Sequence, residues 1–440
     1  MVRKIIISVS IFIVVSIVLI FALLHFDEDE PAPYDDDLRL PAVNILPQEN
    51  AFFSFKEAVE KMYFPYQRKE LLDDVINGKK WDKDFVKELL EKNKETFYFV
   101  NQAVLLPKFQ FPEFQNPESV SLGYLLPEET FSIYKIAQIE LIKAKQLFYS
   151  GKEKEAFDEI FKILHLAQSV EDSPRPIDVQ YISAVSAKKI SLKVMQDMVG
   201  QIISPSESLK SYIEKLNRFK GKTDASVILL KLSYMRSAKA FDSLKTNEET
   251  RDELIGFGLP FYVKLMIKSD HFYKPNQTKR FFATVFRKQI ENLNHQYYSE
   301  TEHIETQFLF FPPLIVSLEK QEKGFEENYI GKMIYETSAI DISQGQFVTK
   351  CMEDFSVIAT QLLLAIKDYQ LKYGEIPDSL SRLIPEYFSK LPKDPFDGQP
   401  VRFLPGKKII YSVGRDLKDS GGGEDVDFWD KWEPALKIKF

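Results

Sequence analysis

The sequence predicts a mainly α-helical protein with an apolar N-terminal helix and a small α+β module at its C-terminal end. Three observations carry this prediction. Residues 5–26 form a run without a charged side chain. Residues 50–340 place apolar side chains at helical spacing over most of their length. The end of the chain gathers glycine, proline and aspartate into turn-like clusters between short apolar stretches.

Composition limits the classes of protein to consider. A chain of 440 residues has room for two or three domains, and its 44% apolar and 28% charged residues are typical of a folded globular protein. The net charge of −7 argues against nucleic acid as a partner, because phosphate binding needs a basic patch. Cys351 is the only cysteine, so no intrachain disulfide can form, and we expect it in the core.

The apolar run at residues 5–26 predicts a transmembrane signal anchor. As a helix it would rise about 33 Å, enough to cross a bilayer core of about 30 Å. Arg3 and Lys4 precede it and an acidic cluster follows it, so the positive-inside rule places residues 1–4 in the cytoplasm. We therefore expect a single-pass protein of the bacterial inner (cytoplasmic) membrane, with that membrane as a partner and most of the chain in the periplasm.

Residues 27–48 read as an acidic, proline-rich linker. Pro31, Pro33, Pro41 and Pro47 interrupt any helix, and the acidic side chains are expected to keep the segment solvated. We expect it to act as a spacer between the anchor and the folded part.

Residues 49–343 are predicted to form an extracytoplasmic helical domain. Asn50 suits the N-cap of a first helix. The clearest unit, residues 130–170, reads as two helices joined at Gly151, with Ala144 and Ala156 allowing close contact. This unit resembles one tetratricopeptide-like hairpin. Because no 34-residue period continues elsewhere, we expect an irregular helical domain.

A loop rich in proline and aromatic residues lies within this domain at residues 106–118. Its Phe109, Phe111 and Phe114 are expected to cover the neighbouring helices. The alternative is that they line a ligand cleft.

Residues 344–440 are predicted to form a long helix followed by the α+β module. The motifs, in order, are YGEIPDSL (373–380), LPKDPFDG (391–398), YSVGRD (411–416) and GGGEDVDFW (421–429). The segment DPFDG within them is a turn by its chemistry. This order resembles the globular head of the major pseudopilins of type II secretion systems. The likeness does not reach the pilin assembly helix, because no glycine precedes Gly78.

The pseudopilin resemblance implies a calcium site in the acidic loop. Asp416 corresponds to the first family aspartate, and Asp425 and Asp427 correspond to the later pair. Calcium prefers six to eight oxygen ligands on a flexible loop, which the neighbouring glycines allow. The alternative is a solvated acidic turn without metal.

No catalytic motif appears in the sequence, which contains no P-loop, GxSxG or HExxH pattern. The whole chain resembles uncharacterised membrane-anchored bacterial proteins with a helical domain, an Asn-x-x-Gly element like residues 328–331, and the same tail. We expect a non-enzymatic envelope interaction or scaffold protein with a protein partner and a calcium-stabilised C-terminal module. The alternatives are a pilin-like subunit or accessory of a secretion system and an envelope hydrolase that uses carboxylates.

Overall fold

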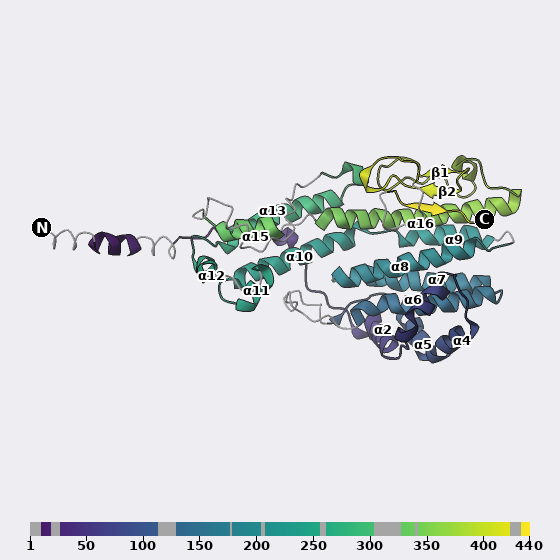
Figure 1. Cartoon of the computed structure of the whole chain (residues 1–440), viewed down its shortest axis with the longest axis horizontal. Coiled ribbons are helices and arrows are strands. Elements are labelled where there is room, and N and C mark those ends of the chain that lie inside the picture. The colour runs from purple at the N-terminus through teal and green to yellow at the C-terminus, as the bar shows by residue number, and fades with distance from the viewer. Residues whose placement is uncertain are drawn as a thin grey trace.

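The protein is elongated and mainly helical in the computed structural model of the chain (Figure 1). The structure describes residues 10–18, 27–112, 129–176, 178–203, 207–255, 261–302, 327–338, 342–422 and 433–440. The predicted helical class and the small C-terminal sheet are both confirmed. The helices are α2 (Ala51–Glu60), α3 (Lys69–Ile76), α4 (Lys83–Lys92), α5 (Lys94–Ala103), α6 (Glu129–Tyr149), α7 (Glu153–Glu171), α8 (Asp178–Val199), α9 (Glu207–Leu216), α10 (Thr223–Ser243), α11 (Glu248–Ile255), α12 (Phe261–Lys268), α13 (Pro275–Leu293), α15 (Tyr329–Ser338) and α16 (Ile342–Tyr373).

The long helix α16 runs from the middle of the molecule to the end on the right of Figure 1. Near its start, Phe347 and Cys351 are buried in an apolar cluster with α10, α13 and α15. Further along, Phe355 and Leu362 belong to a second cluster with α6, α7, α8 and α9. The expectation that Cys351 is a core residue is confirmed, since it is 0% exposed. One helix therefore contributes to both apolar cores.

The predicted hairpin at residues 130–170 is confirmed as α6 and α7. Gly151 adopts a positive φ of 80° in the turn between them, a conformation that favours glycine. Ala144 and Ala156 are fully buried where the two helices meet. Together with α8, the hairpin forms the layer on which the rest of this half packs.

The predicted roles of Asn50 and of the aromatic loop at residues 106–118 can be compared with the structure. The Asn50 side chain accepts a hydrogen bond from Phe52 N (3.1 Å), which confirms the predicted N-cap of α2. Its amide donates to Gln110 O (2.8 Å), so it ties the loop to the helix. Phe109 and Phe111 are each 1% exposed and pack on α2, so they cover the helices as predicted. Phe114 lies outside the described residues.

The predicted membrane anchor at residues 5–26 is wrong. Within that run the structure describes residues 10–18, which are helical. In the described part of the chain, no helix has both the length and the apolar character needed to cross a membrane. This finding also overturns the predicted single-pass location in the inner membrane.

Residues 27–41 are bound to the helices rather than extended as a spacer; we call this segment the strap. Asp29 accepts hydrogen bonds from the backbone N–H groups of Asn276 (2.8 Å) and Gln277 (3.3 Å), the first turn of α13. Arg287 on the same helix binds Asp37 at 2.8 Å. The acidic side chains are held by α13, because a helix N-terminus and cationic groups both stabilise carboxylates.

The C-terminal module contains a three-stranded antiparallel sheet in the order β1-β2-β3. Its strands are β1 (Arg402–Leu404), β2 (Ile409–Tyr411) and β3 (Ala435–Lys437), with Ile410 opposite Phe403 and Leu436. Ile410 is fully buried in the same cluster as the second half of α16. The module therefore packs directly on the helical body.

The Asn-x-x-Gly element at residues 328–331 joins α15 to the start of α13. Asn328 is fully buried with a φ of 51°, and its side-chain oxygen accepts a hydrogen bond from Lys274 N (2.8 Å). A Cβ added at Gly331 would overlap the Thr278 hydroxyl and the Asn328 amide. The glycine therefore allows the two helices to approach each other.

Gly331→Ala should lower the free energy of unfolding by at least about 2 kcal/mol, because the new methyl group enters a filled and hydrogen-bonded space. The measurement is urea unfolding followed by circular dichroism. Gly345→Ala is the matched control, since Gly345 is also helical but has no atom within 4 Å of an added Cβ. That variant should instead gain up to about 1 kcal/mol from helix propensity. Equal stabilities for the two variants would contradict the close-contact role of Gly331.

Candidate functional site

Only one of the three predicted calcium ligands lies in the described residues. Asp416 ends a 3₁₀ turn (Gly414–Asp416), and its carboxylate accepts a hydrogen bond from Lys418 N at 3.2 Å. Asp425 and Asp427 fall outside the described residues. Within the described ranges, no three His, Cys, Asp or Glu side chains are grouped to hold a metal ion. Calcium at Asp416, Asp425 and Asp427 therefore stays a prediction.

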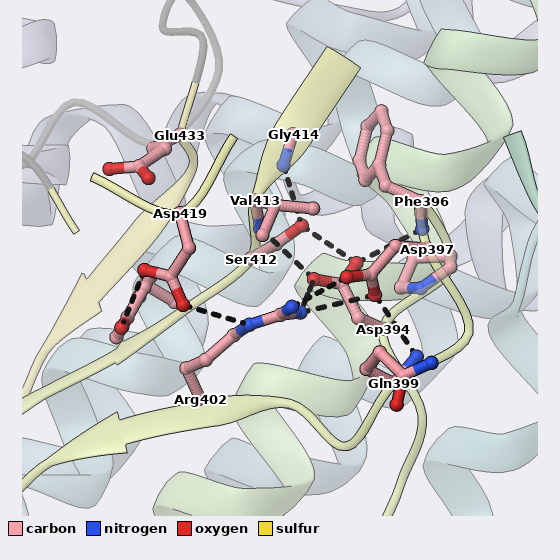
Figure 2. A network of polar contacts seen from close by, with 12 residues as sticks. Asp394, Phe396, Asp397, Gln399, Arg402, Ser412, Val413, Gly414, Asp419 and Glu433 are labelled. Carbon is pink, nitrogen blue, oxygen red and sulfur yellow. Dashed lines mark hydrogen bonds and ion pairs between the residues drawn. The ribbon is translucent and has the colours of Figure 1, made fainter. Parts of the chain in front are cut away.

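The described part of the module instead centres on an internal cation, Arg402 of β1 (Figure 2). Its guanidinium lies 2.8 Å from Asp394, 2.5 Å from Asp397 and 3.5 Å from Asp419. The planar group offers several N–H donors and stays charged at any physiological pH. Burial favours the neutral acid at Asp397, yet the hydrogen bonds from Arg402 outweigh it and hold the pKa of this carboxyl below its usual value.

Asp394 connects the DPFDG turn to the end of β2. Its buried carboxylate accepts hydrogen bonds from Phe396 N (3.0 Å), Ser412 Oγ (2.8 Å) and Val413 N (3.0 Å), besides Arg402. Gly398 in the same turn has a φ of 72°. The predicted turn is confirmed, and its first aspartate also organises the segment that leads into the acidic loop.

Two further carboxylates shape the start of that loop. Asp419 accepts hydrogen bonds from the Tyr411 hydroxyl and from Gly421 N, both at 3.1 Å. Glu433 accepts from Ser420 N and from Gly422 N, the latter at 3.0 Å. Figure 2 shows Asp419 facing Arg402, with Glu433 apart from that cluster. These carboxylates already have protein donors, and their hydrogen bonds fix residues 420–422 at the start of the loop.

A groove in the helical half offers a different kind of site. It opens between α3 and α8 over α6 and has a volume of about 750 Å³. Its lining is Phe64, Tyr66, Lys69, Asp73, Ile76, Asn77, Tyr134, Lys135, Gln138, Ile182, Ser183, Ser186, Lys189, Ile190 and Lys193. Tyr66 and Ile182 are 61% and 60% exposed. Such large apolar surfaces, gathered in one concavity, are typical of binding sites.

The groove is basic although the chain is acidic. Lys69, Lys135, Lys189 and Lys193 line it, against the single carboxylate of Asp73. Lys135 donates to the Tyr66 hydroxyl (2.7 Å), which leaves its charge near the groove surface. In the described part of the chain, neither Lys69 nor Lys193 forms an ion pair. The groove therefore combines apolar contact area with positive charge.

Neighbouring carboxylates that share a lysine do occur in the described residues, but they lie outside the groove lining. Glu140 and Glu159 are both bound by Lys162, and burial raises the pKa of Glu140 to about 7.

Glu171 and Glu353 form the second pair. Both are bound by the buried Lys188, at 2.5 and 2.9 Å. Burial, together with Glu171, raises the pKa of Glu353 to about 8. Like the first pair, these carboxylates are absent from the groove lining. The groove thus presents the chemistry of binding rather than paired acid and base groups.

Reasoning from the sequence missed the groove because its walls come from α3, α6 and α8, which are distant along the chain. One local signal was present. Ile182, Lys189 and Lys193 are spaced by seven and four residues and so share a face of α8. Arg402 carried no such signal, since its carboxylate partners come from two separate segments, the DPFDG turn and the region of Asp419. No family model, curated protein or solved structure matches the chain.

Proposed function

We propose that the protein is a non-enzymatic interaction protein that binds a peptide segment of a partner protein in the groove between α3 and α8. The observation that supports this proposal is the groove itself, an open concavity of about 750 Å³ with aromatic and aliphatic walls and a single carboxylate. A hydrolase of the carboxylate type needs two facing acids next to its substrate. A peptide site needs apolar anchor pockets and a polar rim.

The two most exposed apolar residues define where the peptide makes contact. Tyr66 stands on the α3 side and Ile182 on the α8 side, so a bound segment would bury both. Aromatic and aliphatic anchors of this kind dominate the binding energy of most interfaces. Tyr134 lies between them on α6, where burial raises the pKa of its hydroxyl and keeps it neutral as a hydrogen-bond donor.

The test is selection of peptides from a displayed library of random twelve-residue sequences on the full-length protein. Selected peptides should lose at least about tenfold in affinity on Tyr66→Ala/Ile182→Ala, because each anchor contributes about 1 kcal/mol or more. Ile203→Ala is the control, since Ile203 is 89% exposed but lies outside the groove. Failure to select a peptide whose binding depends on Tyr66 and Ile182 would refute the proposal.

A further inference from the structure

The distribution of charge around the groove specifies which peptides it fits. The chain carries a net charge of −7, yet four lysines line the groove against one aspartate. That aspartate, Asp73, accepts a hydrogen bond from Gln138 (3.3 Å) on the groove floor. Opposite charges across an interface steer association and select partners. The groove is therefore complementary to negative charge.

The lysines lie on both sides of the groove. Lys189 and Lys193 are one helical turn apart on α8, and Lys69 lies on α3. Lys135 lies on α6 near Tyr66, with its ammonium 5.1 Å from the centre of that ring. A segment lying along the groove would thus meet positive charge on each flank and apolar surface beneath it.

Several arginines outside the groove are bound by carboxylates of the protein itself. Arg280 and Arg287 on α13 pair with Glu30 and Asp37 of the strap, and Arg402 is held by three aspartates. These arginines are therefore not available to a nucleic acid backbone, which needs a continuous track of cationic groups. This observation favours a short acidic peptide over a polynucleotide.

We infer that the groove binds an acidic segment of a partner protein, with carboxylates on both flanks of an aromatic or aliphatic anchor. The inference rests on the proposed function and narrows it to one class of partner. Lys189 and Lys193 fix the carboxylates along α8, Lys69 does so on the opposite wall, and Tyr66 and Ile182 contact the anchor.

The experiment measures fluorescence anisotropy of four probes with the full-length protein. The probes are a twelve-residue peptide of glutamates with two phenylalanines, the same peptide with glutamine or with lysine in place of glutamate, and a twelve-nucleotide oligothymidylate. The glutamate peptide should bind at least tenfold more tightly than the glutamine peptide at low salt. That difference should shrink in high salt, because exposed charges are screened. Lys189→Glu/Lys193→Glu should reverse the preference toward the lysine peptide, whereas Lys56→Glu/Lys87→Glu, at exposed positions outside the groove, should leave it unchanged.

Three other results would contradict the inference. Equal affinity for the glutamate and glutamine peptides would overturn the acidic preference and leave peptide binding in place. Tighter binding of the oligothymidylate would overturn the inference in favour of a nucleic acid. Binding of none of the peptides would refute both this inference and the proposed function. Unchanged melting temperatures of the charge-reversal variants would show that they remain folded.

Discussion

Lys188→Met should lower the free energy of unfolding by about 4 kcal/mol, because it leaves a buried carboxylate without its cation. Lys188 on α8 is 2% exposed and contacts Glu171 of α7, Glu353 of α16 and the side-chain oxygen of Gln168. The charged group therefore lies where three helices meet. Methionine has a similar volume but offers no donor, so the loss reflects the charge rather than the packing. The measurement is urea unfolding at pH 7.

Two further variants test that explanation. Lys94→Met removes an exposed lysine that pairs with Glu91, both 67% exposed, and should cost less than about 1 kcal/mol. The triple variant Lys188→Met/Glu171→Leu/Glu353→Leu replaces the whole cluster with apolar groups and should regain most of the lost stability. A triple variant as unstable as Lys188→Met would show that packing, not an unpaired charge, determines the loss.

The same cluster should make stability depend on pH. Burial raises the folded-state pKa of Glu353 to about 8, whereas the pKa of a glutamate in the unfolded chain is about 4.3. The folded state thus keeps a proton that the unfolded state has lost. The stability contributed by Glu353 is complete below about pH 4 and decreases as the pH rises to about 8. Glu353→Gln should remove the contribution of Glu353 to the slope of unfolding free energy against pH. The contribution of Glu140, whose pKa burial raises to about 7, should remain.

Arg402→Met should destabilise the protein by about 3 kcal/mol, because it leaves Asp394 buried and Asp397 partly buried without their shared cation. Asp394 would keep its hydrogen bonds from Phe396, Ser412 and Val413, so we expect a smaller loss than at Lys188. The effect should appear in the melting temperature and as faster proteolysis of the acidic loop, whose Asp419 also contacts Arg402.

Conservative and distant substitutions separate charge from geometry at Arg402. Arg402→Lys keeps the charge but cannot form the forked contact with Asp397, so it should recover only part of the stability. Arg382→Met removes a cation whose partner Asp378 is 71% exposed and should leave the melting temperature unchanged. If Arg402→Met melts at the parent temperature, the guanidinium does not hold the module together.

The sequence by itself determined the elements whose signals are local. Helical periodicity predicted α6 and α7, Asn50 predicted the start of α2, and DPFDG predicted the turn at residues 394–398. A helix start depends on the side chains within one turn of it, so a single chain carries that information. The transmembrane anchor predicted at residues 5–26 was wrong, because that prediction rested only on the length and hydropathy of an apolar run.

The tertiary structure alone decided which charges meet and where a cavity opens. Lys188 pairs with Glu353, 165 residues later, and Asp29 caps α13, almost 250 residues away. The acidic strap was predicted to be solvated because its composition does not reveal the cations of α13. Ion pairs and grooves depend on distances through space, which the fold creates only when helices such as α3, α6 and α8 pack side by side. The basic groove, and with it the proposed function, therefore became visible only in the folded molecule.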